Sequence, residues 1–266
     1  MEKENCYISV VLPCHNEENN VKELYKRLKA IFSQQSWSHE IIFVDDHSTD
    51  KTFKNLLRLA KNDPNLKILR LAKNCGQTAA TKAGFDYASG NLIITMDSDL
   101  EHAPEDIPAI VDKIEKEGYD FVSTWRFDRS KEKFGKKVPS QISNALARLM
   151  TSVEAHDFGS GFKGYKKEVV KSLPMYGNFH RYIVAIAASK GYKFGEVKIK
   201  HRVRPNGVSH YGAERLLRGL FDLTYITLML RFPENKLSAF LRRLADTYYY
   251  KNKDKVYVIE KTVGFK

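Results

Sequence analysis

The first 125 residues alternate short apolar runs with amphipathic segments. Short apolar runs bounded by polar residues are typical of buried strands, and amphipathic segments between them are typical of crossover helices. The pattern predicts strands over Ile8–Leu12, Ile41–Val44, Leu66–Leu71, Leu92–Met96 and Phe121–Thr124. It predicts helices over Glu17–Phe32, from a cap at Ser48, Thr49 or Asp50 through Ala60, and over Thr78–Ala88 and Pro104–Lys116. The expected fold is α/β, with a mostly parallel sheet flanked by helices.

Beyond residue 125 the alternation is less regular. Helices are predicted over Ser140–Met150, Lys166–Ser172, His180–Lys190 and Ala213–Arg231, with a further helical stripe from Leu237 to Tyr248. Strands are predicted over Glu196–His201 and Val256–Ile259. We therefore expect one α/β domain over residues 1–212 and a basic extension of amphipathic helices and a short strand over residues 213–266.

Charge is distributed unevenly along the chain. The 266 residues carry 44 Lys and Arg against 32 Asp and Glu, a net charge of +12. Residues 1–125 hold 15 basic and 20 acidic residues (net −5), and residues 126–266 hold 29 and 12 (net +17). An acidic first half and a basic second half indicate a site for cations and a surface for phosphates or an anionic membrane.

Composition also excludes several classes of protein. The three cysteines form no C-x-x-C pair, so neither a disulfide framework nor a zinc site is expected, and a cytoplasmic location fits. The acidic N-terminus does not resemble a signal peptide. The longest apolar segment, Gly219–Leu230, has 12 residues and contains Asp222, so no membrane-spanning helix is expected.

Acidic residues follow two of the predicted strands directly. Asp45 and Asp46 follow Ile41–Val44, and Asp97-Ser98-Asp99 follows Leu92–Met96. Ligands of open parallel sheets bind outside the carboxyl ends of the strands, where these residues are expected to meet. Carboxylates supply the oxygen ligands of Mg²⁺ or Mn²⁺, and substrate phosphates complete the shell. The pattern predicts a metal–nucleotide site.

Two other functions use some of the same features. The net positive charge would suit a nucleic-acid-binding protein, but no recognised reading motif supports one, and we expect no nucleic-acid partner. A nucleotidyltransferase could also use D-x-D and a metal, but no Gly-rich phosphate loop occurs near the N-terminus.

An ordered set of short motifs resembles glycosyltransferase family 2. The motifs are Pro13-Cys14-His15-Asn16-Glu17-Glu18, Val44-Asp45-Asp46-His47-Ser48-Thr49-Asp50, Asn74-Cys75-Gly76, Met96-Asp97-Ser98-Asp99-Leu100, Ser160-Gly161-Phe162 and Gly207-Val208-Ser209-His210-Tyr211. Within that family the chain is most similar to polyprenyl-phosphate glycosyltransferases, such as dolichol-phosphate mannose synthase and undecaprenyl-phosphate glucosyltransferase. The resemblance covers roughly residues 7–212 and implies a GT-A fold, which is Rossmann-like.

The resemblance implies a role for several residues. A nucleotide-sugar site would be formed by Pro13, Asn16, Glu17, Asp45, Asp46, Gly76, Lys82, Asp97, Ser98, Arg204 and Ser209. The metal, Mg²⁺ or Mn²⁺, would be held by Asp97, Asp99 and Glu101, and the acceptor phosphate by Arg126, Arg129 and Lys136. The catalytic set would be Asp97, Asp99, Arg126 and Asp157. Glu101 stands where many relatives have Gln, and His210 where they usually have Lys.

The implied reaction is an inverting, metal-dependent transfer of a sugar from a UDP- or GDP-sugar to polyprenyl phosphate. An acceptor phosphate is already ionised at pH 7, so the reaction needs positioning of two anions more than a general base. The alternative is a soluble family member that glycosylates a saccharide or protein hydroxyl. That reaction needs a base, for which Asp157 is the candidate.

The C-terminal extension has two interpretations of similar weight. In Ala213–Arg231, basic residues could face lipid headgroups and leucines the acyl chains, placing the protein peripherally on the inner face of the cytoplasmic membrane. Alternatively, this helix packs on the sheet or forms a contact in a homo-oligomer.

Overall fold

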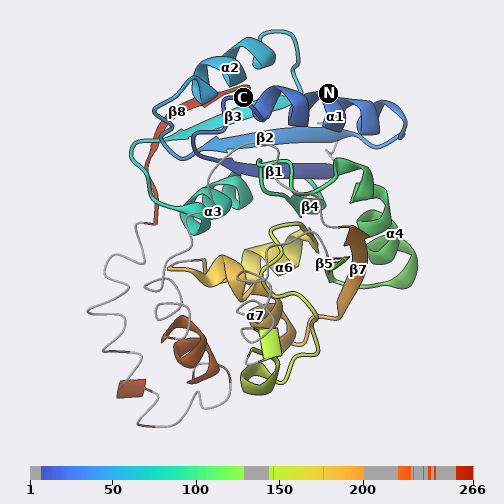
Figure 1. Cartoon of the computed structure of the whole chain (residues 1–266), viewed down its shortest axis with the longest axis vertical. Helices are drawn as coiled ribbons and strands as arrows, with labels where there is room; N and C mark the ends of the chain where they lie inside the picture. The colour runs from blue at the N-terminus through green and yellow to red at the C-terminus, as the bar shows by residue number, and fades with distance from the viewer. Residues whose placement is uncertain are drawn as a thin grey trace.

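The computed structural model describes residues 7–128, 144–145, 147–175, 177–200, 221–228 and 256–265, with residues 230, 236, 239, 240 and 243. All five strands predicted in the first 125 residues are present (Figure 1). They are β1 (Ile8–Cys14), β2 (His39–Asp45), β3 (Leu66–Leu71), β4 (Leu92–Thr95) and β5 (Phe121–Asp128). The four helices predicted between them are α1 (Val21–Ser33), α2 (Thr52–Ala60), α3 (Gln77–Tyr87) and α4 (Ile107–Glu117), with a 3-10 turn η1 (Pro104–Asp106) before α4.

The second half supplies the remaining described elements. These are β6 (Lys163–Lys166), α6 (Lys167–Ser172), the 3-10 turn η2 (Phe179–Arg181), α7 (Ile183–Ser189), β7 (Phe194–Lys200) and β8 (Ile259–Val263). Residues 147–151 and 221–228 are also helical. Among these described residues no helix is both long enough and apolar enough to cross a membrane.

The described strands form one mixed sheet in the order β7-β5-β6-β4-β1-β2-β3-β8. β1 pairs in parallel with β2 and β4, and β2 pairs in parallel with β3. The carboxyl ends of these strands therefore lie at the same edge of the sheet, which brings Cys14, Asp45 and Thr95 to one end. β6 and β8 run antiparallel to their neighbours. The expectation of a mostly parallel α/β sheet is confirmed.

Alternate residues of β1 show how the two faces are covered. Val10 and Leu12 pack in the core beneath α1, α2 and α4, and Val11 packs in the core beneath α3, α6 and α7. A sheet buried on both faces explains why its strands are almost continuously apolar. Figure 1 shows α1 and α2 on one side of the molecule and α6 and α7 on the other.

Among the differences from the sequence prediction are two boundaries and one unpredicted strand. α1 begins at Val21 rather than Glu17, because residues 18–20 form a turn in which the Asn20 N–H donates to the Glu17 carbonyl at 2.9 Å. β6 was not predicted, because its sequence, Lys-Gly-Tyr-Lys, lacks an apolar run. The C-terminal strand lies at Ile259–Val263, slightly later than expected, and pairs with β3 of the main sheet.

Candidate active site

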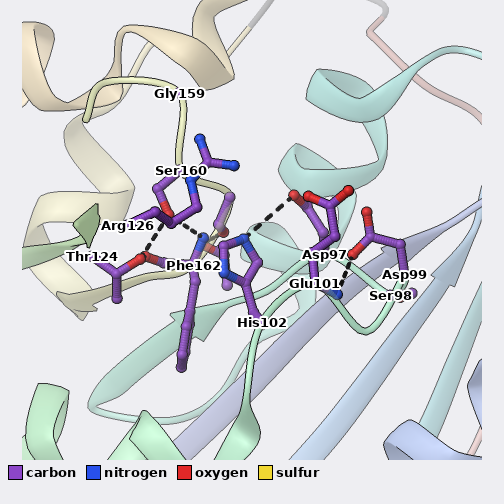
Figure 2. Close-up of polar contacts among 12 residues, drawn as sticks. Asp97, Ser98, Asp99, Glu101, His102, Thr124, Arg126, Gly159, Ser160 and Phe162 are labelled. Atoms are coloured by element: carbon purple, nitrogen blue, oxygen red, sulfur yellow. Dashed lines mark hydrogen bonds and ion pairs between the residues drawn. The ribbon is translucent and has the colours of Figure 1, made fainter. Parts of the chain in front are cut away.

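The turn after β4 carries the Asp97-Ser98-Asp99 sequence at the carboxyl edge of the sheet. Ser98 Oγ donates to the Pro13 carbonyl at 2.9 Å, which joins this turn to the end of β1. Asp99 Oδ1 accepts the Glu101 backbone N–H at 3.0 Å, and Leu100 between them has a φ of 65°. The turn therefore points the carboxylates of Asp97, Asp99 and Glu101 to the same side (Figure 2).

Asp97 lies in a strongly negative environment. Burial, followed by the nearby Asp99 charge, raises the pKa of Asp97 to about 7, and Glu101 adds to the effect. Lys163 and Arg126 act in the opposite direction. Gln77 Nε2, in the first residue of α3, donates to Asp97 Oδ1 at 2.6 Å. Crowded carboxylates with a raised pKa favour a cation, because a cation removes their mutual repulsion.

His102 is buried beside Asp97. It is 2% exposed, and its Nε2 lies 4.0 Å from Asp97 Oδ2. Burial, assisted by the Arg126 charge, lowers the pKa of His102 to about 3, so the imidazole is neutral at pH 7. Its Nδ1 has no hydrogen-bond partner within the part of the chain that the structure describes.

Arg126, at the end of β5, and Asp157 form a two-pronged ion pair. Arg126 Nε donates to Asp157 Oδ2 at 2.7 Å, and Nη2 donates to Oδ1 at 3.2 Å. Side-chain exposure is 13% for Arg126 and 3% for Asp157. A bidentate guanidinium–carboxylate pair holds both groups in one orientation. Figure 2 shows the Arg126 guanidinium beside the loop at Gly159 and Ser160.

The loop from Asp157 to Lys163 borders the site on the side of Arg126. Thr124 Oγ1 and Ser160 Oγ lie 2.6 Å apart, and the Gly161 carbonyl accepts Thr95 Oγ1 at 3.1 Å. Gly161 approaches Asp97 so closely that a Cβ there would lie 2.2 Å from Asp97 Oδ2. A side chain at position 161 would therefore displace the Asp97 carboxylate.

The predicted nucleotide residues at the ends of β1 and β2 have clear structural partners. Asp46 accepts the backbone N–H groups of Cys75 at 2.7 Å and Gly76 at 2.8 Å, just before α3. Gly76 has a φ of 85°, a conformation that glycine adopts readily. Asp45 is fully buried, which raises its pKa, and it accepts the Ser48 N–H at 3.2 Å.

Other predicted residues lie around this edge or elsewhere. Asn16 is exposed, and its Oδ1 accepts the Thr49 N–H at 2.9 Å. Glu17 Oε2 accepts Asn20 Nδ2 at 2.5 Å. Lys82 forms an ion pair with Asp86 one turn further along α3. Four predicted residues lie outside the described residues: Arg129, Lys136, Arg204 and Ser209.

The residues present fit a divalent cation held by two carboxylates. No group of three His, Cys, Asp or Glu side chains within the described ranges is gathered closely enough to hold a metal by itself. Mg²⁺ and Mn²⁺ sites on nucleotides commonly use one or two carboxylates, and the diphosphate supplies further ligands. The concentration of negative charge at Asp97 is the observation in favour of such a site.

Three residues around Asp97 were not singled out from the sequence. Gln77 begins a helix, His102 follows the D-x-D turn, and Lys163 lies in the unpredicted strand β6. Their positions depend on contacts between segments far apart in the chain. Only the Leu100-Glu101-His102 continuation of the D-x-D sequence could have drawn attention to His102.

A mixed sheet with a D-x-D turn at the carboxyl edge, facing an arginine, defines the class of GT-A glycosyltransferases. The structure is similar to that of glucosyl-3-phosphoglycerate synthase from Mycobacterium tuberculosis in complex with Mn²⁺, UDP and glucosyl-3-phosphoglycerate. The TM-score is 0.63 at 20% identity, with 84% of this chain and 78% of the other covered.

Sequence comparison identifies the family. Residues 9–173 match the family Glycosyl transferase family 2. The chain is 37% identical over 228 residues to dodecaprenyl-phosphate galacturonate synthase of Rhizobium johnstonii, covering 85% of this chain and 68% of the relative. It is 34% identical over 236 residues to undecaprenyl-phosphate 4-deoxy-4-formamido-L-arabinose transferase of Edwardsiella ictaluri, covering 88% and 71%. The chain belongs to glycosyltransferase family 2 and is a glycosyltransferase, as the motifs predicted.

Proposed function

We propose that this enzyme transfers a sugar, with inversion, from a nucleotide-diphosphate sugar to a polyprenyl phosphate. The observation that carries the proposal is the 37% identity, over 85% of the chain, to a protein named for its dodecaprenyl-phosphate product. Similarity across both halves of the chain includes the segments that hold the D-x-D turn and Arg126. UDP- and GDP-sugars both remain candidates for the donor.

The ion pair of Arg126 and Asp157 supports a phosphate acceptor. A hydroxyl acceptor would need a base, and Asp157 was the candidate from the sequence. In the structure Asp157 is buried, and both of its oxygens accept N–H groups of Arg126. A carboxylate held in this way is a poor proton acceptor, because protonation would break the pair. An ionised phosphate needs no such base.

In this proposal, different residues of the site bind the donor and the acceptor. Asp97 and Asp99 would hold Mg²⁺ or Mn²⁺, with Glu101 beside them, and the bound cation would neutralise charge on the leaving diphosphate. Asp46 keeps Cys75 and Gly76 in place at the nucleotide side of the site. Arg126, oriented by Asp157, would direct the acceptor phosphate toward the anomeric carbon.

A polyprenyl phosphate acceptor also implies a location. Its hydrocarbon chain is anchored in a bilayer, so we place the enzyme peripherally on the cytoplasmic face of the membrane. The strongly basic second half of the chain, net +17, supports attraction to an anionic surface. Whether residues 213–266 make that contact or join copies in a homo-oligomer is a question for flotation and sedimentation measurements.

The test is transfer from radiolabelled nucleotide sugars to undecaprenyl phosphate in detergent, with Mn²⁺ present. The donors are first selected by thermal stabilisation with Mn²⁺, since a ligand that binds the folded state raises its apparent stability. Label in the lipid phase, absent with the Asp99→Ala variant, is the expected result. Label only on saccharides or protein would instead support the alternative of a hydroxyl acceptor and reject the proposal.

A further inference from the structure

Lys163 is a buried lysine to which the proposed reaction assigns no role. It opens β6, between Thr95 of β4 and Ser123 of β5, and is 2% exposed. Lysine is seldom fully buried unless it is paired. Its Nζ donates to the Ser160 carbonyl, in the loop that carries Gly161 against Asp97.

The charge of Lys163 acts on both sides of the site. Burial lowers the pKa of Lys163 to about 8, while the charges of Asp157 and Asp97 limit the decrease, so the ammonium form predominates at neutral pH. Asp157 already pairs with Arg126 through both oxygens. The Ser160 carbonyl that Lys163 contacts precedes Gly161, which packs against the Asp97 carboxylate, and the Lys163 charge favours the ionised form of Asp97.

We propose that Lys163 is a positioning residue that weakens cation binding at Asp97 until the donor diphosphate is present. The inference rests on the proposed function, because it requires Asp97 to hold the divalent cation. An ammonium held at the Ser160 carbonyl, next to the glycine that packs against Asp97, stabilises the empty carboxylate and repels an incoming cation. The diphosphate brings negative charges that outweigh this repulsion, so cation and donor bind together. After transfer, the same repulsion favours release of the cation with the nucleoside diphosphate.

A purely structural role for Lys163 would have a different signature. If the side chain served only to hold the Ser160 carbonyl, its removal would loosen the loop and weaken cation binding. Lys163→Gln separates the two roles, because it keeps an N–H donor and loses the charge. Lys163→Arg keeps the charge. Lys166→Gln is the matched control, since Lys166 ends the same strand, pairs with Asp120 at 2.8 Å, and lies about 10 Å along β6.

The experiment measures Mn²⁺ binding to the full chain by titration, first alone and then with UDP or GDP. We expect Lys163→Gln to bind Mn²⁺ alone about 10-fold more tightly than the wild type. In this variant the nucleotide should raise the Mn²⁺ affinity less than in the wild type, by a similar factor. The kcat should fall, because the cation and the nucleoside diphosphate are released more slowly. Lys163→Arg and Lys166→Gln should bind Mn²⁺ like the wild type. If Lys163→Gln does not fold by circular dichroism, Lys163→Met carries the same expectation.

Two results would overturn the inference, and they differ in what they leave standing. If Lys163→Gln binds Mn²⁺ alone with unchanged or lower affinity while Asp97→Asn loses binding, Lys163 has no role in cation affinity and the proposed function stands. If Asp97→Asn also leaves Mn²⁺ binding unchanged, the cation site lies elsewhere. In that case both the inference and the metal assignment fail.

Discussion

The carboxylates at the two edges of the central sheet have opposite environments. At the amino edge, Glu40 is the second residue of β2 and is 2% exposed. Its Oε1 accepts the Ser89 N–H at 2.7 Å and also contacts the Ser9 and Ser89 hydroxyls, and its Oε2 pairs with Lys67. Although burial alone would raise it, the pKa of Glu40 is lowered by these partners.

At the carboxyl edge, Asp97 accepts a hydrogen bond from the Gln77 side chain and has two acidic neighbours, Asp99 and Glu101. Its pKa is raised to about 7, against the direction of the shift at Glu40. A carboxylate whose partners are supplied by the protein stabilises the fold. A carboxylate close to other carboxylates destabilises the fold, and binding of a cation removes the repulsion between them. The pKa shifts of these two carboxylates are therefore opposite in direction, as expected for an acid paired within the fold and an acid placed to bind a cation.

The largest effect should follow from Asp97→Asn, which removes the charge and keeps the shape. We expect transfer to fall about 1000-fold, because charge on the leaving diphosphate is no longer neutralised. The melting temperature of the ligand-free protein should stay the same or rise, since one member of a crowded cluster becomes neutral. Radiolabel transfer and calorimetry measure the two quantities. Turnover close to that of the wild type would contradict the assignment of Asp97.

Arg126→Lys should have the next largest effect. Lysine keeps the charge but cannot form the two-pronged contact with Asp157 or a bidentate contact with phosphate. We expect the KM for the acceptor to rise about 30-fold, with the KM for the donor changed little. Steady-state kinetics with each substrate varied in turn separate the two. An unchanged acceptor KM would remove Arg126 from the acceptor site.

The sequence was sufficient to predict the edge at which the site lies. Apolar runs ending in Asp45 and in Asp97 give both the strands and their direction, so the convergence of the acids follows from parallel topology. The five strands and four helices of the first 125 residues were predicted for the same reason. A short continuous apolar run indicates a strand that is buried on both faces, and amphipathic periodicity indicates the helices between such strands.

The sequence was insufficient where contacts join distant segments. β6 begins with a buried lysine whose Nζ contacts the Ser160 carbonyl and whose charged form is favoured by Asp157 and Asp97. Gln77 reaches Asp97 because α3 starts opposite the turn after β4, which is 20 residues away in the chain. No local pattern contains this information. The pairing of Arg126 with Asp157, which changes the interpretation of Asp157 as a base, is of the same kind.

Glu40→Gln tests the other edge of the sheet. The amide cannot accept from Ser9, Ser89 and Lys67 as the carboxylate does, so the free energy of unfolding should fall by about 2 kcal/mol at pH 7. Transfer per folded molecule should be unchanged, because Glu40 lies at the edge opposite the site. Chemical denaturation and the assay at a temperature below the transition measure both. Loss of activity without loss of stability would show that the two edges are not independent.

The pH dependence of stability should change in the same variant. The folded pKa of Glu40 lies below its unfolded value, so its contribution is complete above the unfolded pKa. That contribution is lost as the pH falls through the folded pKa, when Glu40 becomes protonated. The wild type should therefore lose more stability than Glu40→Gln on going from pH 7 to acidic pH. Parallel slopes of unfolding free energy against pH would contradict this expectation.

A pair of glycine substitutions gives the smallest expected effects and the sharpest contrast. A Cβ at Gly161 would lie 2.2 Å from Asp97 Oδ2, and a Cβ at Gly84 would lie 2.2 Å from Val11 Cγ1 in the core. Gly161→Ala should push the Asp97 carboxylate aside and raise the KM for the donor about 5-fold, with little change in melting temperature. Gly84→Ala should lower the melting temperature and leave the KM unchanged, because the overlap falls between α3 and β1. If the two variants changed the donor KM and the melting temperature equally, this contrast would be wrong. The same steric overlap would then have the same effect beside Asp97 as in the core.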